Sequence, residues 1–186
     1  LYELYGIYGD PGLKPQESTS FEIGADLRPT SWLNYSVTWY RTEYRRQIVF
    51  FSSFDPSFNV PSSIDSLAGY RNIKRPSWIQ GWEHALEIGP AEGIWKIRAQ
   101  LTNQESFQEF DNGYQRSLPY VADVIASLVA DVDWDVTWLK VGVSRVGKRY
   151  TGRYNELTVT LPGGLGDHRF AQFVPSYYTA QLSAGW

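Results

Sequence analysis

Cysteine and methionine are both absent from the 186 residues, and there are only two histidines. A chain without cysteine has no disulfide framework, no thiolate nucleophile and no cysteine-based zinc or iron–sulfur site. His84 and His168 are far apart in the sequence, and neither has a second histidine or a carboxylate at the spacing of metal ligands. We therefore expect no resident metal and no cofactor.

The chain also lacks an excess of basic residues, since its net charge is -3 and its pI is about 5.4. Proteins that bind nucleic acids usually carry a basic stripe, so we expect no nucleic acid partner. No run approaches the roughly 18 apolar residues of a membrane-spanning helix. These absences leave open a membrane β-barrel, because its strands are short and alternate between apolar and polar residues.

Catalytic motifs are missing as well. The glycine-rich stretch LPGGLGDH has neither a following helix pattern nor a Lys-Ser/Thr pair, so it is not a phosphate-binding loop. No serine stands in the context of a nucleophile elbow. Glu83 and Glu87 would be roughly 13 Å apart on a strand that rises ~3.3 Å per residue, too far for the two carboxylates of a glycosidase. We expect no enzymatic activity.

Aromatic residues are abundant, with 13 Tyr, 9 Phe and 8 Trp. They favour strands and are enriched at membrane interfaces and on sugar-binding surfaces. Apolar and polar residues also alternate with a period of two, which is typical of strands with two different faces. About seven such segments recur, near residues 20–28, 33–40, 82–88, 95–102, 124–130, 139–144 and 178–186.

The connections between these segments alternate between short and long. Tight turns are expected near Pro29, Glu92 and Asp133, and Ser/Pro- or Gly-rich stretches separate the remaining segments. A membrane barrel has short turns at one end and large loops at the other, and its strands have about ten residues. A soluble β-sandwich has no reason to place every tight turn at one end. A soluble carbohydrate-binding β-sandwich, with aromatic residues in its core, remains the alternative.

In a barrel, the charged face of each strand would line the lumen and the apolar face would meet lipid, because the reverse would place several charges in hydrocarbon. Charged lumen residues can form pairs across neighbouring strands. The expected lumen-facing residues are Glu22, Asp26, Arg28, Glu83, Glu87, Lys96 and Arg98. The expected lipid-facing residues include Phe21, Ile23, Ala25, Leu27, Leu33, Val37, Ile97, Leu101, Leu139, Val141, Leu182 and Ala184.

Two stretches at the expected loop ends combine aromatic rings with guanidinium groups, YRTEYRR at 40–46 and KRYTGRY at 148–154. Arginine offers a planar fork for carboxylate, phosphate or catecholate oxygens, and tyrosine adds apolar area with a polar tip. Such pairs suit an anionic iron chelate, although the same residues would also suit a solvated loop or a surface that faces lipopolysaccharide. The candidate ligand-binding residues are Tyr40, Arg41, Tyr44, Arg45, Arg149, Tyr150, Arg153 and Tyr154.

Several motifs, in order along the chain, resemble those of one family. YGDPGLKPQESTSFEIGADL resembles the stretch that opens a strand in the β-barrel of TonB-dependent outer-membrane receptors. YRNIKRPSWIQGWEHALEI, RSLPYVADVIASL, VGKRYTGRYN and FVPSYYTAQLSAGW resemble later segments of the same barrel. The resemblance implies an all-β, antiparallel transmembrane barrel fragment with short periplasmic turns and long extracellular loops. Residues 1–186 would form part of a barrel of about 22 strands, with the plug domain and the final hairpin outside this chain.

The resemblance also implies a function. The parent protein would lie in the outer membrane of a Gram-negative bacterium and take up a scarce ligand, for which we favour a ferric siderophore. Cobalamin, haem and oligosaccharides are the other ligand classes. The implied partners are outer-membrane lipid, the small-molecule ligand, and the TonB energy-coupling protein, which would act through the missing plug.

Overall fold

The computed structural model describes residues 2–52, 68–90, 92–111, 113, 115–150, 157–160, 167–170 and 173–186. One four-residue helix, α1 (Tyr2–Tyr5), precedes the strands. Among the described residues, no helix is long and apolar enough to cross a membrane.

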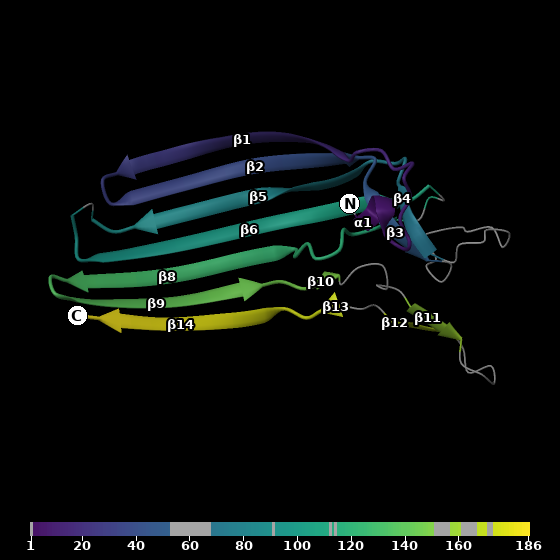
Figure 1. The fold of residues 1–186 in the computed structure, drawn as a ribbon. Coiled ribbons are helices and arrows are strands. Elements are labelled where there is room, and N and C mark those ends of the chain that lie inside the picture. The colour runs from purple at the N-terminus through teal and green to yellow at the C-terminus, as the bar shows by residue number, and fades with distance from the viewer. Residues whose placement is uncertain are drawn as a thin grey trace.

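One antiparallel sheet dominates the molecule (Figure 1). Its strands lie in the order β1-β2-β5-β6-β8-β9-β14, and the short strand β7 also pairs with β6. The bounds are β1 (Glu17–Thr30), β2 (Leu33–Arg45), β5 (Ser77–Ile88), β6 (Trp95–Glu109), β7 (Gln115–Arg116), β8 (Val124–Trp134), β9 (Thr137–Val146) and β14 (Tyr177–Gly185). The prediction of an all-β, antiparallel fold with about seven main strands is confirmed. The sheet does not close, and β1 and β14 are its edges.

Tight turns join the long strands at one end of the sheet, as predicted (Figure 1). Ser31 and Trp32 connect β1 to β2, and Asp135 and Val136 connect β8 to β9. Asp135 has a positive φ of 55°, a conformation that Asp tolerates better than most residues. Gly89, with a φ of 153°, begins the turn from β5 to β6 and donates its N–H to the Trp32 carbonyl at 2.9 Å.

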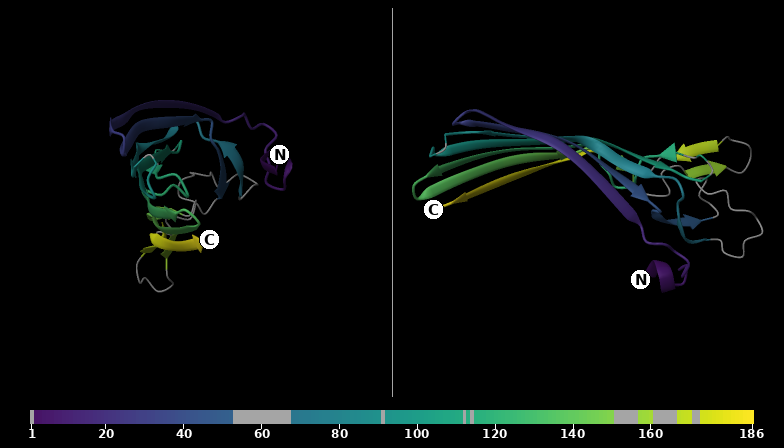
Figure 2. Two further views of the ribbon diagram at one scale, coloured as in Figure 1. Left: turned by 90° about the vertical axis from the view of Figure 1, so that its left-hand side faces the viewer. Right: turned by 90° about the horizontal axis from the view of Figure 1, so that it is seen from above.

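Three small two-stranded sheets occupy the opposite end, where the long connections lie (Figure 1). They pair β3 (Ile48–Ser52) with β4 (Ala68–Asn72), β10 (Arg149–Tyr150) with β13 (Phe173–Val174), and β11 (Leu157–Thr160) with β12 (Asp167–Phe170). Seen along the strands, the main sheet curves into a trough, and the β3–β4 hairpin lies on its concave side (Figure 2). The sheet therefore has tight turns at one end, which we call the turn end, and long connections at the other, which we call the loop end.

The two faces of the trough differ in polarity because side chains alternate along every strand. One cross-strand row joins Asp26, Ser36, Ala85, Gln100, Ser127, Ser144 and Thr179. A row on the other face joins Leu27, Tyr35, Leu86, Ala99, Leu128, Val143 and Ala180. Gln47, which directly precedes β3, contacts the polar-face residues Ser77 and Gln108, and the β3–β4 hairpin lies on the concave side, so the polar face is the concave one.

Among the described residues, no second layer covers the apolar, convex face. Ile23 is 62% exposed and Leu182 is 74% exposed. The buried apolar residues Ile73, Phe110, Leu118 and Ala122 instead lie near the loop end of the sheet. The alternative of a soluble sandwich required Phe21, Leu33 and Ile97 to be buried between two sheets. That alternative is wrong, because Phe21 is 60% exposed and the main sheet is a single layer.

Gly81 in β5 allows close pairing with β6. A Cβ atom at this position would lie 2.5 Å from the Asn103 carbonyl oxygen and 2.8 Å from the Gln104 Cβ. We expect Gly81→Ala to lower the free energy of unfolding of the intact protein by about 1–3 kcal/mol, the usual cost of overpacking. Urea unfolding followed by circular dichroism would measure this loss.

Gly142→Ala in β9 is the matched control. A Cβ atom at Gly142 would meet only the Gln181 side chain, at 3.0 Å, and that side chain can turn away. We expect a smaller loss of stability than for Gly81→Ala. Equal losses in the two variants would contradict the close approach of β5 and β6.

Candidate functional site

A polar hollow of about 280 Å³ lies on the concave face near the loop end of the sheet. Strand β6 contributes Gln104 and Ser106 from the polar face, and the segment between β7 and β8 contributes Ser117, Val121 and Asp123. Lys148 and Tyr150, which follow β9, complete the lining together with Glu105. The hollow thus presents hydroxyl, amide, phenol, carboxylate and ammonium groups.

Backbone hydrogen bonds fix the segment between β7 and β8 over the sheet. The Leu118 N–H donates to the Ser106 hydroxyl at 3.0 Å, and the Gln104 N–H donates to the Asp123 carbonyl at 2.9 Å. Tyr120, which has a positive φ of 62°, donates its N–H to the Tyr150 carbonyl at 2.7 Å. The walls of the hollow are therefore joined to one another as well as to β6.

Gly147 allows Asp123 to approach the end of β9. A Cβ atom at Gly147 would lie 2.0 Å from the Asp123 Oδ1 atom and 2.9 Å from the Val124 carbonyl oxygen. The Gly147 N–H also donates to that carbonyl, at 2.7 Å. A residue without a side chain is required here, and the glycine brings the Asp123 carboxylate close to the backbone before Lys148.

Tyr40 on β2 connects to the hollow through Gln104. Its hydroxyl donates to the Gln104 Oε1 atom, and the Gln104 amide donates to the Ala122 carbonyl at 2.8 Å. Tyr44, four residues later on β2, lies on the same polar face, opposite Ser18 of β1 and Ser77 of β5. Of the candidate ligand-binding residues, Tyr150 therefore lines the hollow, and Tyr40 contacts it only through Gln104.

The candidate arginines are arranged differently. Arg41 lies on the convex face, where its guanidinium contacts Glu43 at 2.9 Å and Gln80 at 3.0 Å and lies over the Trp78 ring at 5.1 Å. Arg45 follows on the same side of β2 and is exposed. Arg149 lies over the Tyr177 ring at 5.4 Å. Arg153 and Tyr154 are outside the described residues.

The predicted charged face is continuous in the structure. Glu22, Asp26, Glu83, Glu87, Lys96 and Arg98 all lie on polar-face rows. Lys96 forms an ion pair with Glu87 at 3.5 Å, and Arg98 forms one with Asp131. Arg28 lines a second concave hollow, of about 630 Å³, at the turn end, together with Asn34, Glu87 and Lys96. The buried Oδ1 atom of Asn34 has no hydrogen-bond partner in the described part of the chain.

A buried polar network supports the loop end and has no counterpart among the sequence candidates. The Gln47 Oε1 atom accepts hydrogen bonds from the Ser77 hydroxyl and the Gln108 amide, both at 2.8 Å. Gln108, which is 1% exposed, accepts in turn from the Arg116 Nε atom at 3.1 Å. The Arg116 guanidinium lies over the Phe110 ring at 4.6 Å. The only signal in the sequence is that Ser77 and Gln108 continue the polar alternation of β5 and β6 beyond the predicted strands.

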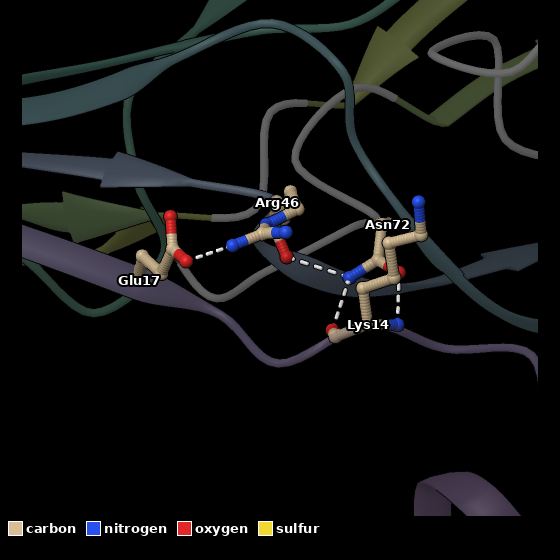
Figure 3. Close-up of polar contacts among 4 residues, drawn as sticks. All are labelled: Lys14, Glu17, Arg46 and Asn72. Atoms are coloured by element: carbon tan, nitrogen blue, oxygen red, sulfur yellow. Dashed lines mark hydrogen bonds and ion pairs between the residues drawn. The ribbon is translucent and has the colours of Figure 1, made fainter.

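Asn72 holds the N-terminal segment against the β3–β4 hairpin (Figure 3). Its amide nitrogen donates to the Lys14 carbonyl at 2.9 Å and to the Arg46 carbonyl at 2.7 Å, and its Oδ1 atom accepts from the Lys14 N–H at 2.8 Å. Arg46 has a positive φ of 55° and forms an ion pair with Glu17 at the start of β1. One amide therefore fixes three segments at the loop end.

These groups can bind a polar or anionic ligand without covalent chemistry. Among the described residues, no group of three or more His, Cys, Asp or Glu side chains could hold a metal ion. The residues of the hollow instead supply several hydrogen-bond donors, with the Lys148 ammonium as a positive charge.

Comparison with known proteins identifies the architecture. The family model described as TonB dependent receptor-like, beta-barrel, matches residues 1–186. No curated protein matches the sequence.

Solved structures match the fold at low sequence identity. The siderophore receptor PirA from Acinetobacter baumannii is 22% identical, with a TM-score of 0.64 over 96% of this chain and 26% of that protein. The pyoverdine outer membrane receptor FpvA from Pseudomonas aeruginosa is 18% identical, with a TM-score of 0.59 over 92% of this chain and 23% of that protein. The copper transporter OprC is 15% identical, with a TM-score of 0.60 over 94% of this chain and 23% of that protein. The chain spans about a quarter of the length of these proteins.

We expect Asn72→Asp to loosen the loop end, because a carboxylate cannot donate to the two carbonyls that the Asn72 amide holds. Losing these hydrogen bonds should speed amide exchange in the segment around Lys14 by about tenfold. Hydrogen exchange followed by mass spectrometry of the intact protein would detect the change.

Lys14→Ala is the control, because Asn72 contacts only backbone atoms of Lys14. We expect exchange in this segment to stay as slow as in the unmodified protein. Fast exchange in Lys14→Ala, or slow exchange in Asn72→Asp, would show that the amide does not fix this segment.

Proposed function

Because the family model matches its whole length, the chain belongs to the TonB-dependent receptor-like β-barrel family, and we propose that it forms part of the wall of an outer-membrane receptor that imports a small ligand. Members of this family are transporters of the Gram-negative outer membrane rather than enzymes. We propose that residues 1–186 are one part of the barrel domain, and that the plug and the final hairpin lie elsewhere in the intact receptor.

The separation of the two faces carries this proposal. A single curved layer with exposed apolar side chains on its convex face suits a wall between lipid and a polar lumen. In this arrangement Ile97 and Leu101 meet lipid, whereas Arg98 and Gln100 face the lumen. The tight turns are then periplasmic, and the polar hollow near Tyr150 lies toward the extracellular side.

We propose an anionic iron chelate, a ferric siderophore, as the ligand. Its oxygens would accept hydrogen bonds from the Tyr150 phenol and from the Lys148 ammonium, while Tyr40 would hold the Gln104 side chain in the wall of the hollow. Two of the similar structures are named as siderophore and pyoverdine receptors, whereas a third is named as a copper transporter. The coarser proposal, import of a small molecule, therefore does not depend on the choice of siderophore over cobalamin, haem or oligosaccharide.

The charged groups at the turn end would have another role. Arg28, Glu87 and Lys96 line the larger concave hollow at the turn end, the proposed periplasmic side, away from Tyr150. We propose that they contact the plug, through which the TonB protein would supply energy. Arg28 would meet an acidic group of the plug, and the Asn34 Oδ1 atom would accept a hydrogen bond from an N–H or O–H donor of the plug.

Ile97→Arg tests the assignment of the faces. An arginine on the lipid side costs about 2–4 kcal/mol at mid-depth and less toward either surface, and Ile97 lies two residues inside the turn end of β6, so we expect a clear loss of receptor assembled in the outer membrane. Arg98→Ala removes an exposed ion pair with Asp131, worth at most about 1 kcal/mol, and should assemble nearly as well as the unmodified receptor. The amount of heat-modifiable receptor in outer-membrane fractions gives the comparison. Equal tolerance of the two substitutions would mean that the faces are reversed.

Lys148→Ala tests the ligand. Losing one charge-assisted hydrogen bond should weaken binding of the ferric siderophore by about tenfold. Lys140→Ala, on the same concave face but toward the turn end, is the control and should bind normally. Uptake of radioactive iron, supplied on a panel of catecholate and hydroxamate chelates to iron-limited cells, identifies the chelate. Normal growth of a receptor deletion strain on every iron chelate would refute iron import.

A further inference from the structure

The side chain of Tyr40 reaches across a whole strand to contact Gln104. Tyr40 on β2, Gly81 on β5 and Gln104 on β6 form one cross-strand row on the concave face. Neighbouring strands lie about 4.8 Å apart, so a contact between β2 and β6 must span about 10 Å. The phenol bridges this distance because Gly81, which lies between the two residues, has no side chain in its path.

The partners of the Gln104 amide determine its orientation. The Ala122 carbonyl can only accept a hydrogen bond, so the amide nitrogen of Gln104 must face it, at 2.8 Å. The amide oxygen then faces Tyr40, and the phenol must donate to it. The opposite orientation would place the amide oxygen against the Ala122 carbonyl oxygen. The two bonds therefore hold the amide in one of its two possible orientations.

The segment that carries Ala122 is fixed over β6 as well. The Gln104 N–H donates to the Asp123 carbonyl at 2.9 Å, next to the bond made by the side-chain amide. Ala122 is 4% exposed, and removing the donor of a buried carbonyl is costly. The backbone and the side chain of Gln104 thus bind two successive carbonyls of the same segment.

The nitrogen end of the amide is the end that faces the polar hollow of about 280 Å³. Val121 and Asp123, the neighbours of Ala122, line this hollow, whereas none of its described lining residues belongs to β2. In the described part of the chain, the two side-chain bonds leave one N–H of the Gln104 amide for a ligand. The Tyr40 phenol has no such hydrogen left, because it donates to Gln104.

From this geometry we propose that Tyr40 and Gln104 make the hollow selective for a ligand group that accepts hydrogen bonds, such as an anionic oxygen of an iron chelate. Gln104 would donate its remaining N–H to that oxygen, and Tyr40 is a positioning residue that does not touch the ligand. A ligand with an ammonium group at this point would meet an N–H and bind weakly. This selectivity rests on the proposed function, because it concerns the hollow assigned there to the imported ligand.

Binding of two ferric complexes to the purified intact receptor would test this selectivity. One probe is a ferric tris-catecholate, which has anionic oxygens, and the other is a ferric trihydroxamate with a pendant ammonium group. Tyr40→Phe and Gln104→Leu should each lower the ratio of the affinity for the catecholate to that for the hydroxamate about fivefold or more. The double variant should be no worse than Gln104→Leu alone, because Tyr40 acts only through Gln104. Additive losses would overturn the positioning role, since Tyr40 would then contact the ligand itself.

Thr42→Val is the matched control. It removes a hydroxyl from the same face of β2, and this hydroxyl contacts Ser20 on β1, at 2.9 Å. The ratio of affinities should stay as in the unmodified receptor.

A measurement without ligand separates this selectivity from the proposed import. In receptor labelled with ¹⁵N-glutamine, the side-chain amide signal of Gln104 is the one that Gln104→Leu removes. We expect its protons to exchange with water at least tenfold faster in Tyr40→Phe, and at the unmodified rate in Thr42→Val. Unchanged exchange in Tyr40→Phe would overturn the role of Tyr40 whether or not either ferric complex binds, so the two proposals can fail separately.

Discussion

The fold depends on one constraint, that the described long strands form a single layer of sheet with no second sheet packed along their length. Each strand therefore presents one set of side chains on the polar, concave face and another set on the apolar, convex face. In the proposed membrane wall, backbone N–H and C=O groups must pair between strands, because hydrocarbon offers them no other partner. A register shift of one residue would exchange the two faces of a whole strand. The tight turns at Gly89 and Asp135 fix the register where two of the hairpins begin.

The constraint also explains where burial occurs. The main sheet buries few apolar side chains, so the small core near Ile73 and Phe110 belongs to the loop end. There the Gln47 side chain joins the end of β2 to buried groups on β5 and β6 through Ser77 and Gln108. A satisfied polar network of this kind is rigid, because each buried group would otherwise lose its partner. The candidate ligand hollow thus lies beside a fixed support although its walls include loop residues.

The sequence predicted structural features that depend on adjacent residues, such as the face to which a side chain points. It did not predict contacts between residues that lie far apart in the chain. Alternation predicted the faces of Ile97 and Arg98, because adjacent residues on a strand must point to opposite sides. The same rule separates Tyr40 from Arg41, which the sequence analysis grouped in one binding stretch at a loop end, because β2 continues as a regular strand as far as Arg45. The contact between Gln47 and Gln108 joins residues 61 positions apart, and no local pattern indicates it.

Strand β6 presents two different surfaces from a single stretch of backbone. Gln104 projects from the concave face and lines the polar hollow, whereas its neighbours Asn103 and Glu105 project from the convex face. Gly81 lies opposite Gln104, and its missing side chain lets the two strands approach closely at this position. Because both surfaces share these peptide units, a substitution that moves the backbone here must disturb both. A change limited to one side chain, such as Trp82 or Lys148, can affect one surface alone, since the two point to opposite sides of the wall.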